Sequence, residues 1–173
     1  MKEGSQKIST KKITLCGIMT AFAMVLSYIE HILPFSVGLY GIKLGLANLA
    51  IVICLYLLGE KYAIITNFVR IILTFLLFGN FMSLAYSLFG GMISTIIMTL
   101  LKSSKKVSCI GVSICGGVVH NFVQLCVAAV MISTIKIGFY FPVLLISGTV
   151  AGFIIGVVSL AIINNKYIQK IAL

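Results

Sequence analysis

Arg70 lies in the middle of an apolar stretch, Tyr62–Gly79, that is long enough to cross a bilayer. A guanidinium at mid-membrane costs roughly 2.5–3.5 kcal/mol on insertion scales, so such a residue persists where it faces a protein interior and has a partner. The chain contains no aspartate, and its only acidic residues are Glu3, Glu30 and Glu60. Their scarcity removes most ways of building a metal or phosphate enzyme. These features together favour a membrane protein that binds a compound over one that transforms it.

Other polar side chains fall at a similar depth in neighbouring apolar stretches. At about 1.5 Å per residue along a helix, Asn48 lies in the outer half of the membrane, and His120 and Gln124, which share one helix face, lie near its middle. Glu30 lies near the outer end of the first stretch, and Lys43 lies at the outer end of the second. The full set of candidate substrate-binding residues is Glu30, Lys43, Asn48, Arg70, His120, Asn121 and Gln124.

This set predicts a cavity that opens outward, capped by the Pro34–Gly41 connection and suited to a compound with an anionic group. Two alternatives stay open. In the first, the polar groups of Arg70, Asn48 and His120 bond to one another and only stabilise the helix bundle. In the second, an Arg70–Glu30 ion pair cancels the positive charge of the cavity.

Six apolar stretches position these residues. The chain is 61% hydrophobic and 9% charged, with a mean hydropathy of +1.21, which no soluble domain of 173 residues shows. The fold class expected is therefore all-α: a polytopic membrane protein with a bundle of six transmembrane helices. The stretches are Ile13–Leu33, Ile42–Gly59, Tyr62–Gly79, Phe81–Leu101, Val107–Ile135 and Gly138–Ile163.

The lysines orient this bundle. On one side lie only Lys43 and Lys136, while the other side collects Lys2, Lys7, Lys11, Lys12, Lys61, Lys102, Lys105, Lys106, Lys166 and Lys170. By the positive-inside rule both termini are cytoplasmic, and the net charge of +10 reflects these anchors and not nucleic-acid binding. We expect a cytoplasmic basic segment at 1–12, a single six-helix domain at 13–173, and a multi-pass location in the cell membrane.

Small residues line three of the predicted helices. Gly148, Gly152 and Gly156 repeat at four-residue spacing in the sixth, and Ser83, Ser87, Gly91 and Ser94 fall on nearly one face of the fourth. The first carries Gly17 and Ala21. Such faces let helix backbones approach closely, so each either packs inside the bundle or docks a second membrane protein.

Motifs for nucleotide, metal or redox chemistry do not occur. The chain lacks GxxxxGK[ST], HExxH, CxxC and GxSxG patterns, and its cysteines are scattered without metal-like spacing, so no cofactor is expected. Six helices without inverted repeats are few for an autonomous carrier. A substrate-binding protein whose transport is driven by other subunits agrees better with this sequence.

Several ordered segments resemble a known family. Gly41–Asn48 resembles the G-I-K-L-G-L-A-N signature of the Gx transporter family, also catalogued as heptaprenyl diphosphate synthase component I. The resemblance covers nearly the whole chain beyond the first dozen residues. Further matching segments are Leu26–Glu30, Leu55–Gly59, the Arg70 region through Gly79, Ser87–Gly91 and Gly116–Gln124.

That family is similar to the substrate-binding S components of energy-coupling factor importers, which implies a particular role. Such six-helix proteins take a scarce micronutrient from outside and dock on a transmembrane coupling subunit that carries two ATPases. The resemblance implies that Gly17 and Ala21 would form the docking face.

The catalogued synthase name implies an alternative. Prenyl diphosphate synthases hold magnesium and diphosphate with aspartate-rich motifs, and this chain has no aspartate. We therefore expect it not to be an enzyme by itself. It would then be a non-catalytic membrane accessory of heptaprenyl diphosphate or quinone biosynthesis, or an importer of a related compound.

Overall fold

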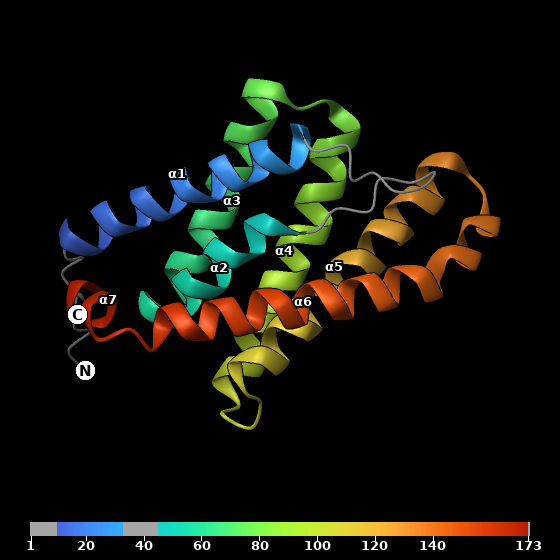
Figure 1. The fold of residues 1–173 in the computed structure, drawn as a ribbon. Helices are drawn as coiled ribbons and strands as arrows, with labels where there is room; N and C mark the ends of the chain where they lie inside the picture. The colour runs from blue at the N-terminus through green and yellow to red at the C-terminus, as the bar shows by residue number, and fades with distance from the viewer. Residues whose placement is uncertain (1–9, 33–44, 173) are drawn as a thin grey trace, which may run out of the picture.

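The computed structural model describes residues 10–32 and 45–172, and the described chain is helical throughout (Figure 1). Gly38, Lys43 and the predicted cap Pro34–Gly41 lie outside the described residues. The helices are α1 (Thr10–Ile32), α2 (Leu46–Leu57), α3 (Glu60–Phe78), α4 (Phe81–Ser103), α5 (Cys109–Ile132), η1 (Ile135–Tyr140), α6 (Phe141–Ile163) and α7 (Lys166–Ala172).

Within 10–32 and 45–172, five helices are long and apolar enough to cross a membrane: α1, α3, α4, α5 and α6. Within the second predicted span, Ile42–Gly59, the described helix α2 has 12 residues and a length of about 18 Å at 1.5 Å per residue, so it is not among the five. Gly45 takes a left-handed conformation, φ 72°, immediately before α2 and sets the start of that helix. The protein is thus an all-helical, multi-pass membrane protein, whereas six spans and cytoplasmic termini stay predictions.

The short helix α2 forms the centre of the bundle. Its residues from Ala50 to Leu55 are each at most 2% exposed, and it contacts α1, α3 and α6. Such all-round burial explains why α2 is apolar on every face. Lys102 closes its carboxyl end by donating from Nζ to the backbone oxygen of Leu55 at 2.7 Å. This buried helix holds Asn48 at a fixed place among the longer helices.

Local signals set the ends of the long helices. Asn80 accepts a hydrogen bond from the backbone N–H of Ser83 at 2.8 Å and caps α4, and Ser108 caps α5 through the N–H of Gly111 at 3.1 Å. Only two residues, Leu58 and Gly59, separate α2 from α3, and Gly79 and Asn80 separate α3 from α4. These short connections make antiparallel neighbours of α2, α3 and α4.

The glycine repeat of α6 packs inside the bundle. A Cβ atom at Gly148 would lie 2.9 Å from the oxygen of Gly117, and one at Gly152 would lie 2.7 Å from the Cα of Ile114. At Gly156 it would lie 2.8 Å from the Cα of Ile110. Backbone contact at this spacing explains why α5 and α6 form the closest helix pair of the bundle. For this repeat, the structure supports the packing interpretation.

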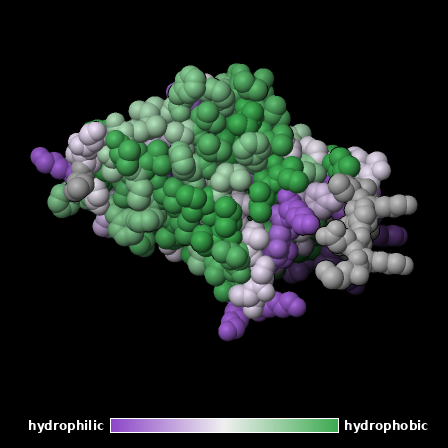
Figure 2. All heavy atoms as spheres, turned by 180° about the vertical axis from the view of Figure 1, so that it is seen from behind, coloured by the Kyte–Doolittle hydropathy of each residue, from purple (hydrophilic) through white to green (hydrophobic). Residues whose placement is uncertain are grey.

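The surface matches a lipid environment. Apolar side chains cover most of the face in Figure 2, and hydrophilic ones gather at its edges. Large apolar residues such as Leu76, Phe81, Val130 and Phe139 are more than 60% exposed. An exposed apolar area of this extent is expected where lipid tails, not water, surround the chain.

Candidate functional site

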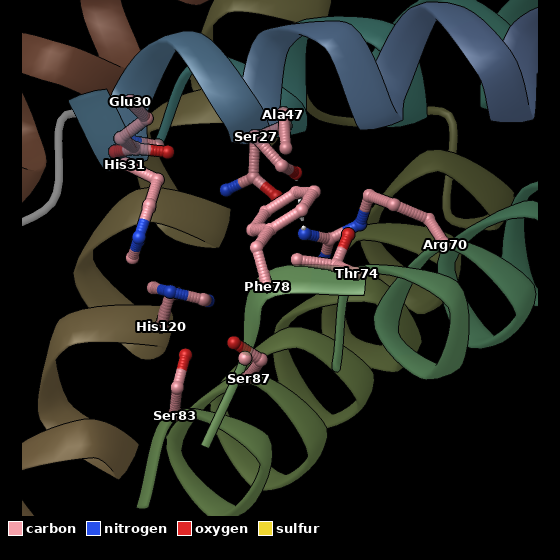
Figure 3. A pocket seen from close by; sticks show the side chains of 13 residues that line it. Ser27, Glu30, His31, Ala47, Arg70, Thr74, Phe78, Ser83, Ser87 and His120 are labelled. Atoms are coloured by element: carbon pink, nitrogen blue, oxygen red, sulfur yellow. Dashed lines mark hydrogen bonds between the residues drawn. The ribbon is translucent and has the colours of Figure 1, made fainter. Parts of the chain in front are cut away.

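Five helices meet around one polar pocket (Figure 3). Its volume is about 70 Å³, which exceeds the space that one water needs and is smaller than a site for a whole drug-sized ligand. Its size suits a small ion or a ligand head group. The lining residues are Ser27, Glu30, His31, Gly45, Ala47, Asn48, Arg70, Thr74, Phe78, Gly79, Ser83, Ser87 and His120.

Arg70 is held by neighbours on two helices. Its Nε and one terminal nitrogen donate to Oδ1 of Asn67 at 3.1 and 2.6 Å, and its other terminal nitrogen donates to Oγ of Ser27 at 3.2 Å. Arg70 is 7% exposed, and Asn67, one turn earlier on α3, is fully buried. A guanidinium has five N–H donors, and these three bonds leave two for a ligand.

Asn67 anchors this arrangement to α4. Its amide nitrogen donates to the backbone oxygen of Gly91 at 2.9 Å and to Oγ1 of Thr95 at 2.7 Å. The amide therefore has a fixed orientation, and its oxygen faces Arg70. Gly91 lies close to this group, because a Cβ atom there would lie 3.4 Å from the Asn67 nitrogen and 3.5 Å from Arg70. The hydrogen bonds between α4 and Asn67 therefore fix the position of the Arg70 guanidinium.

Glu30 supplies negative charge to the same pocket. Its Oε1 accepts a hydrogen bond from the backbone N–H of Gly45 at 2.6 Å, which ties the end of α1 to the start of α2. Its carboxylate also attracts the guanidinium of Arg70 electrostatically. The positive charge of Arg70 is therefore moderated, and the pocket carries both signs of charge.

Two histidines complete the pocket. The ring of His31 on α1 lies 5.6 Å from that of Phe78 on α3, measured between centroids. Nε2 of His120 on α5 lies 3.0 Å from Nε2 of Gln124. Gln124 does not line the pocket, so it acts by orienting the His120 ring. Figure 3 shows both rings facing the space between α1, α4 and α5.

The structure brings Glu30, Asn48, Arg70 and His120 together around this pocket. It does not place Asn121 there, because that amide donates to the backbone oxygen of Leu144 at 2.9 Å and to Oγ of Ser147 at 3.2 Å, both on α6. Asn121 thus links α5 to α6. Lys43 lies outside the described residues. Contact of any of these residues with a ligand stays a prediction.

The candidate set from the sequence leaves out several residues that line the pocket. Ser27 lies three residues before Glu30, and Thr74 lies four residues after Arg70, so i, i+3 and i, i+4 spacing gave a usable signal for these two; His31 directly follows Glu30. Thr74 Oγ1 is buried and has no hydrogen-bond partner among the described residues. A bound water or ligand group would supply one.

The polar groups of this pocket are hydrogen-bond donors and one carboxylate. Among the described residues no group of three or more His, Cys, Asp or Glu side chains is placed to hold a metal ion. The pocket offers donors from Arg70, Asn48 and the histidines, and one carboxylate from Glu30. Donors of this kind can form charge-assisted hydrogen bonds with an anionic group.

The predicted docking face lies apart from this pocket. Gly17 and Ala21 are exposed on α1, and a Cβ atom at Gly17 would meet nothing within 4 Å. Ala23 and Ser27 point instead toward the bundle and are buried. The first two residues are therefore free of internal packing, and their role in docking stays a prediction.

Comparison with known proteins gives one family. The family model described as heptaprenyl diphosphate synthase component I matches residues 19–162, which is most of the chain and includes every described lining residue of the pocket. No curated protein and no solved structure matches the chain.

Proposed function

Because the chain belongs to the heptaprenyl diphosphate synthase component I family and is a multi-pass helical protein, we propose that it is a membrane subunit that binds a small compound. The compound carries an anionic group and is captured from the outer side of the membrane. In its finer form the proposal is a binding subunit similar to an S component of an energy-coupling factor importer. The observation that carries it is Arg70, a charge buried at a pocket and held in place by Asn67 and Ser27.

Burial strengthens the attraction between Arg70 and an anionic group. Charges attract far more strongly in a low-dielectric interior than at a surface, where water and salt screen them. The bonds to Asn67 and Ser27 fix the guanidinium before a ligand arrives, which lowers the entropy lost on binding. An anionic group in the pocket would use the remaining donors of Arg70 with little rearrangement.

Compounds retained during purification provide the test. Wild-type protein, Arg70→Ala and a control, Lys61→Ala, are purified from native membranes, and their bound small molecules are compared by mass spectrometry. Lys61 is exposed at the start of α3, so both variants lose one positive charge. We expect an anionic compound on the wild type and the control, and a loss of at least tenfold on Arg70→Ala. Equal retention by all three proteins contradicts the proposal.

A second experiment uses the fact that Arg70 is the only arginine of the chain. Phenylglyoxal, which modifies guanidinium groups, therefore reports on this side chain. The identified compound should slow the modification in nanodiscs at concentrations that saturate binding. Modification at an unchanged rate under saturation would place the compound elsewhere.

The dependence of transport on ATPases in other subunits can be tested separately. The chain carries no nucleotide-binding motif, so concentrative uptake should require ATP hydrolysis by partner subunits. The protein is reconstituted alone in liposomes and supplied with the identified compound. Accumulation against a gradient without a partner would refute this part of the proposal.

The family description favours a second candidate function. This is a non-catalytic membrane accessory of heptaprenyl diphosphate or quinone biosynthesis, with a soluble prenyltransferase as its partner. Co-purification from native membranes separates the two candidates. A transmembrane coupling protein with two ATPases supports the importer, and a soluble prenyltransferase supports the accessory.

A further inference from the structure

A second cavity lies toward the other end of α1 and is lined by residues of α1, α2, α6 and α7. Its volume is about 420 Å³, within the range of sites that hold a single organic ligand. The floor is formed by α2, where Ile53 is 2% exposed and Cys54 is fully buried. We call this cavity the α1–α7 groove. Its lining residues are Leu15, Ile18, Met19, Phe22, Ile53, Cys54, Leu57, Leu58, Ile162, Ile168 and Ile171.

The walls of the groove are apolar and reach the surface. Ile18 and Phe22 of α1 are 54% and 38% exposed, and Ile171 of α7 is 59% exposed. No polar side chain is found among its lining residues except the thiol of Cys54, which is a small hydrophobe in such surroundings. The groove can therefore take a hydrocarbon chain and offers nothing to a polar ligand.

Positive charge lies at one end of this groove. Lys11 precedes the lining residue Leu15 by four positions, so the two share a face of α1, and Lys12 lies beside it; both lysines are exposed. Lys166 and Lys170 flank Ile168 in α7. Figure 1 places the start of α1 and α7 at the same end of the molecule. The groove thus runs from a cluster of lysines into an apolar interior.

Carboxylates do not neutralise this cluster in the described part of the chain. Glu30 lies at the far end of α1, and Glu60 accepts a hydrogen bond from Oγ of Ser103 on α4 at 2.7 Å. The charge pattern is therefore complementary to a ligand with an anionic head and one long apolar tail.

We propose that the α1–α7 groove holds the isoprenoid chain of a prenyl diphosphate, with Lys11 and Lys12 at its diphosphate. The choice of a prenyl tail rests on the second candidate function, since the family description names a heptaprenyl diphosphate. The groove is lined by α1 on one side of α2 and by α6 and α7 on the other, and its volume of about 420 Å³ is that of a site for a single organic ligand. An accessory with this groove would receive a lipid product from a soluble synthase at the membrane and hold its tail between α1 and α7.

Photocrosslinking tests this assignment. The full chain in nanodiscs is labelled with a benzophenone analogue of geranylgeranyl diphosphate, and the labelled peptides are mapped by mass spectrometry. We expect labelling within 15–22 of α1 and within α7. Unlabelled geranylgeranyl diphosphate should compete, geranylgeraniol should compete about tenfold more weakly, and inorganic diphosphate should not compete. A dipalmitoyl phosphatidate that competes as well as the prenyl diphosphate would show a general lipid groove and overturn the prenyl assignment.

Paired variants separate the head from the tail. The double variant K11Q/K12Q should weaken labelling about tenfold, because each lysine near an anionic head adds to its attraction. The double variant K105Q/K106Q removes the same charge at the α4–α5 connection and should leave labelling unchanged. Ile18→Trp fills the groove from an exposed position, so the protein should fold and lose labelling. Equal labelling of all three variants overturns the proposal.

The polar pocket provides the last discriminating variant. Labelling that Arg70→Ala abolishes and Ile18→Trp leaves intact would place the diphosphate in the Arg70 pocket, which overturns the groove while supporting ligand binding at Arg70. Labelling that depends on Ile18, Lys11 and Lys12 alone supports the groove whether or not the Arg70 pocket binds an anionic compound.

Discussion

Asn67 fixes the guanidinium of Arg70 inside an apolar bundle, because both the nitrogen and the oxygen of its amide form hydrogen bonds. The amide nitrogen is held by Gly91 and Thr95 of α4, so the oxygen can point only toward the guanidinium. Ser27 then connects the same guanidinium to α1. Three helices are joined through one asparagine and one arginine, and such a network is costly to disrupt in part.

We expect Asn67→Ala to lower the free energy of unfolding by about 3 kcal/mol, because it removes two hydrogen bonds from the buried guanidinium of Arg70 and one each from the Thr95 hydroxyl and the Gly91 oxygen. Titration with SDS of the purified protein in mild detergent measures this quantity. Asn164→Ala, at an exposed asparagine just after α6, is the control and should change it by less than about 0.5 kcal/mol. Two variants that unfold at the same SDS fraction would show that the Asn67 network does not stabilise the fold.

At the scale of elements, small residues act in opposite ways on two helices. Gly152 lets α6 touch α5, because a Cβ atom there would meet the Ser113 oxygen at 2.8 Å. Gly17 on α1 faces open space. Glycine is thus required for close helix packing at position 152 of α6, whereas at position 17 of α1 it borders open space.

The same substitution at both glycines measures the difference. Gly152→Ala should destabilise the protein by about 1–3 kcal/mol, because backbone atoms of α5 cannot move away cheaply. Gly17→Ala should be neutral or stabilising by up to about 1 kcal/mol, since alanine favours a helix. Unfolding in SDS is again the measurement, and equal effects of the two variants would contradict internal packing by the α6 repeat.

The exposed face of α1 also carries a test of partner docking. Gly17→Leu should leave folding unchanged, as nothing lies within 4 Å, yet it should block close approach of a partner helix. We expect the variant to lose its membrane partner on co-purification, while Val150→Leu, at an exposed position of α6, keeps it. A Gly17→Leu protein that retains the partner would show that docking uses another face.

For the whole molecule, the lysine distribution predicts the topology. Tags at Lys2, Lys105 and Lys170 should be cytoplasmic, and tags at Gly38 and Lys136 should be outside. Accessibility of single cysteines introduced in a cysteine-free background measures this, with a membrane-impermeant reagent added to intact cells. Labelling of position 105 from outside would reverse the proposed orientation and, with it, the side from which the Arg70 pocket is reached.

The sequence alone was sufficient for much of the bundle. Runs of apolar residues predict helices in a membrane because unpaired backbone groups cannot be exposed to lipid. The stretches predicted to begin at Phe81 and Val107 start within two residues of α4 and α5, which Asn80 and Ser108 cap in the structure. The length of α2 was not predictable in this way, because hydropathy measures how apolar a segment is and not where its backbone stops being helical.

For the candidate site, the sequence identified Arg70, Asn48, His120 and Glu30 because ionisable and amide groups are costly in lipid and must face the protein interior. Only the tertiary structure decided that these four line one pocket, whereas Asn121 binds to α6 and Gln124 to His120. It also decided that the glycines of α6 pack internally and that a groove opens between α1 and α6. The physical reason is that helical spacing fixes which residues share a face, but the rotation and partner of each face follow from packing among all the helices.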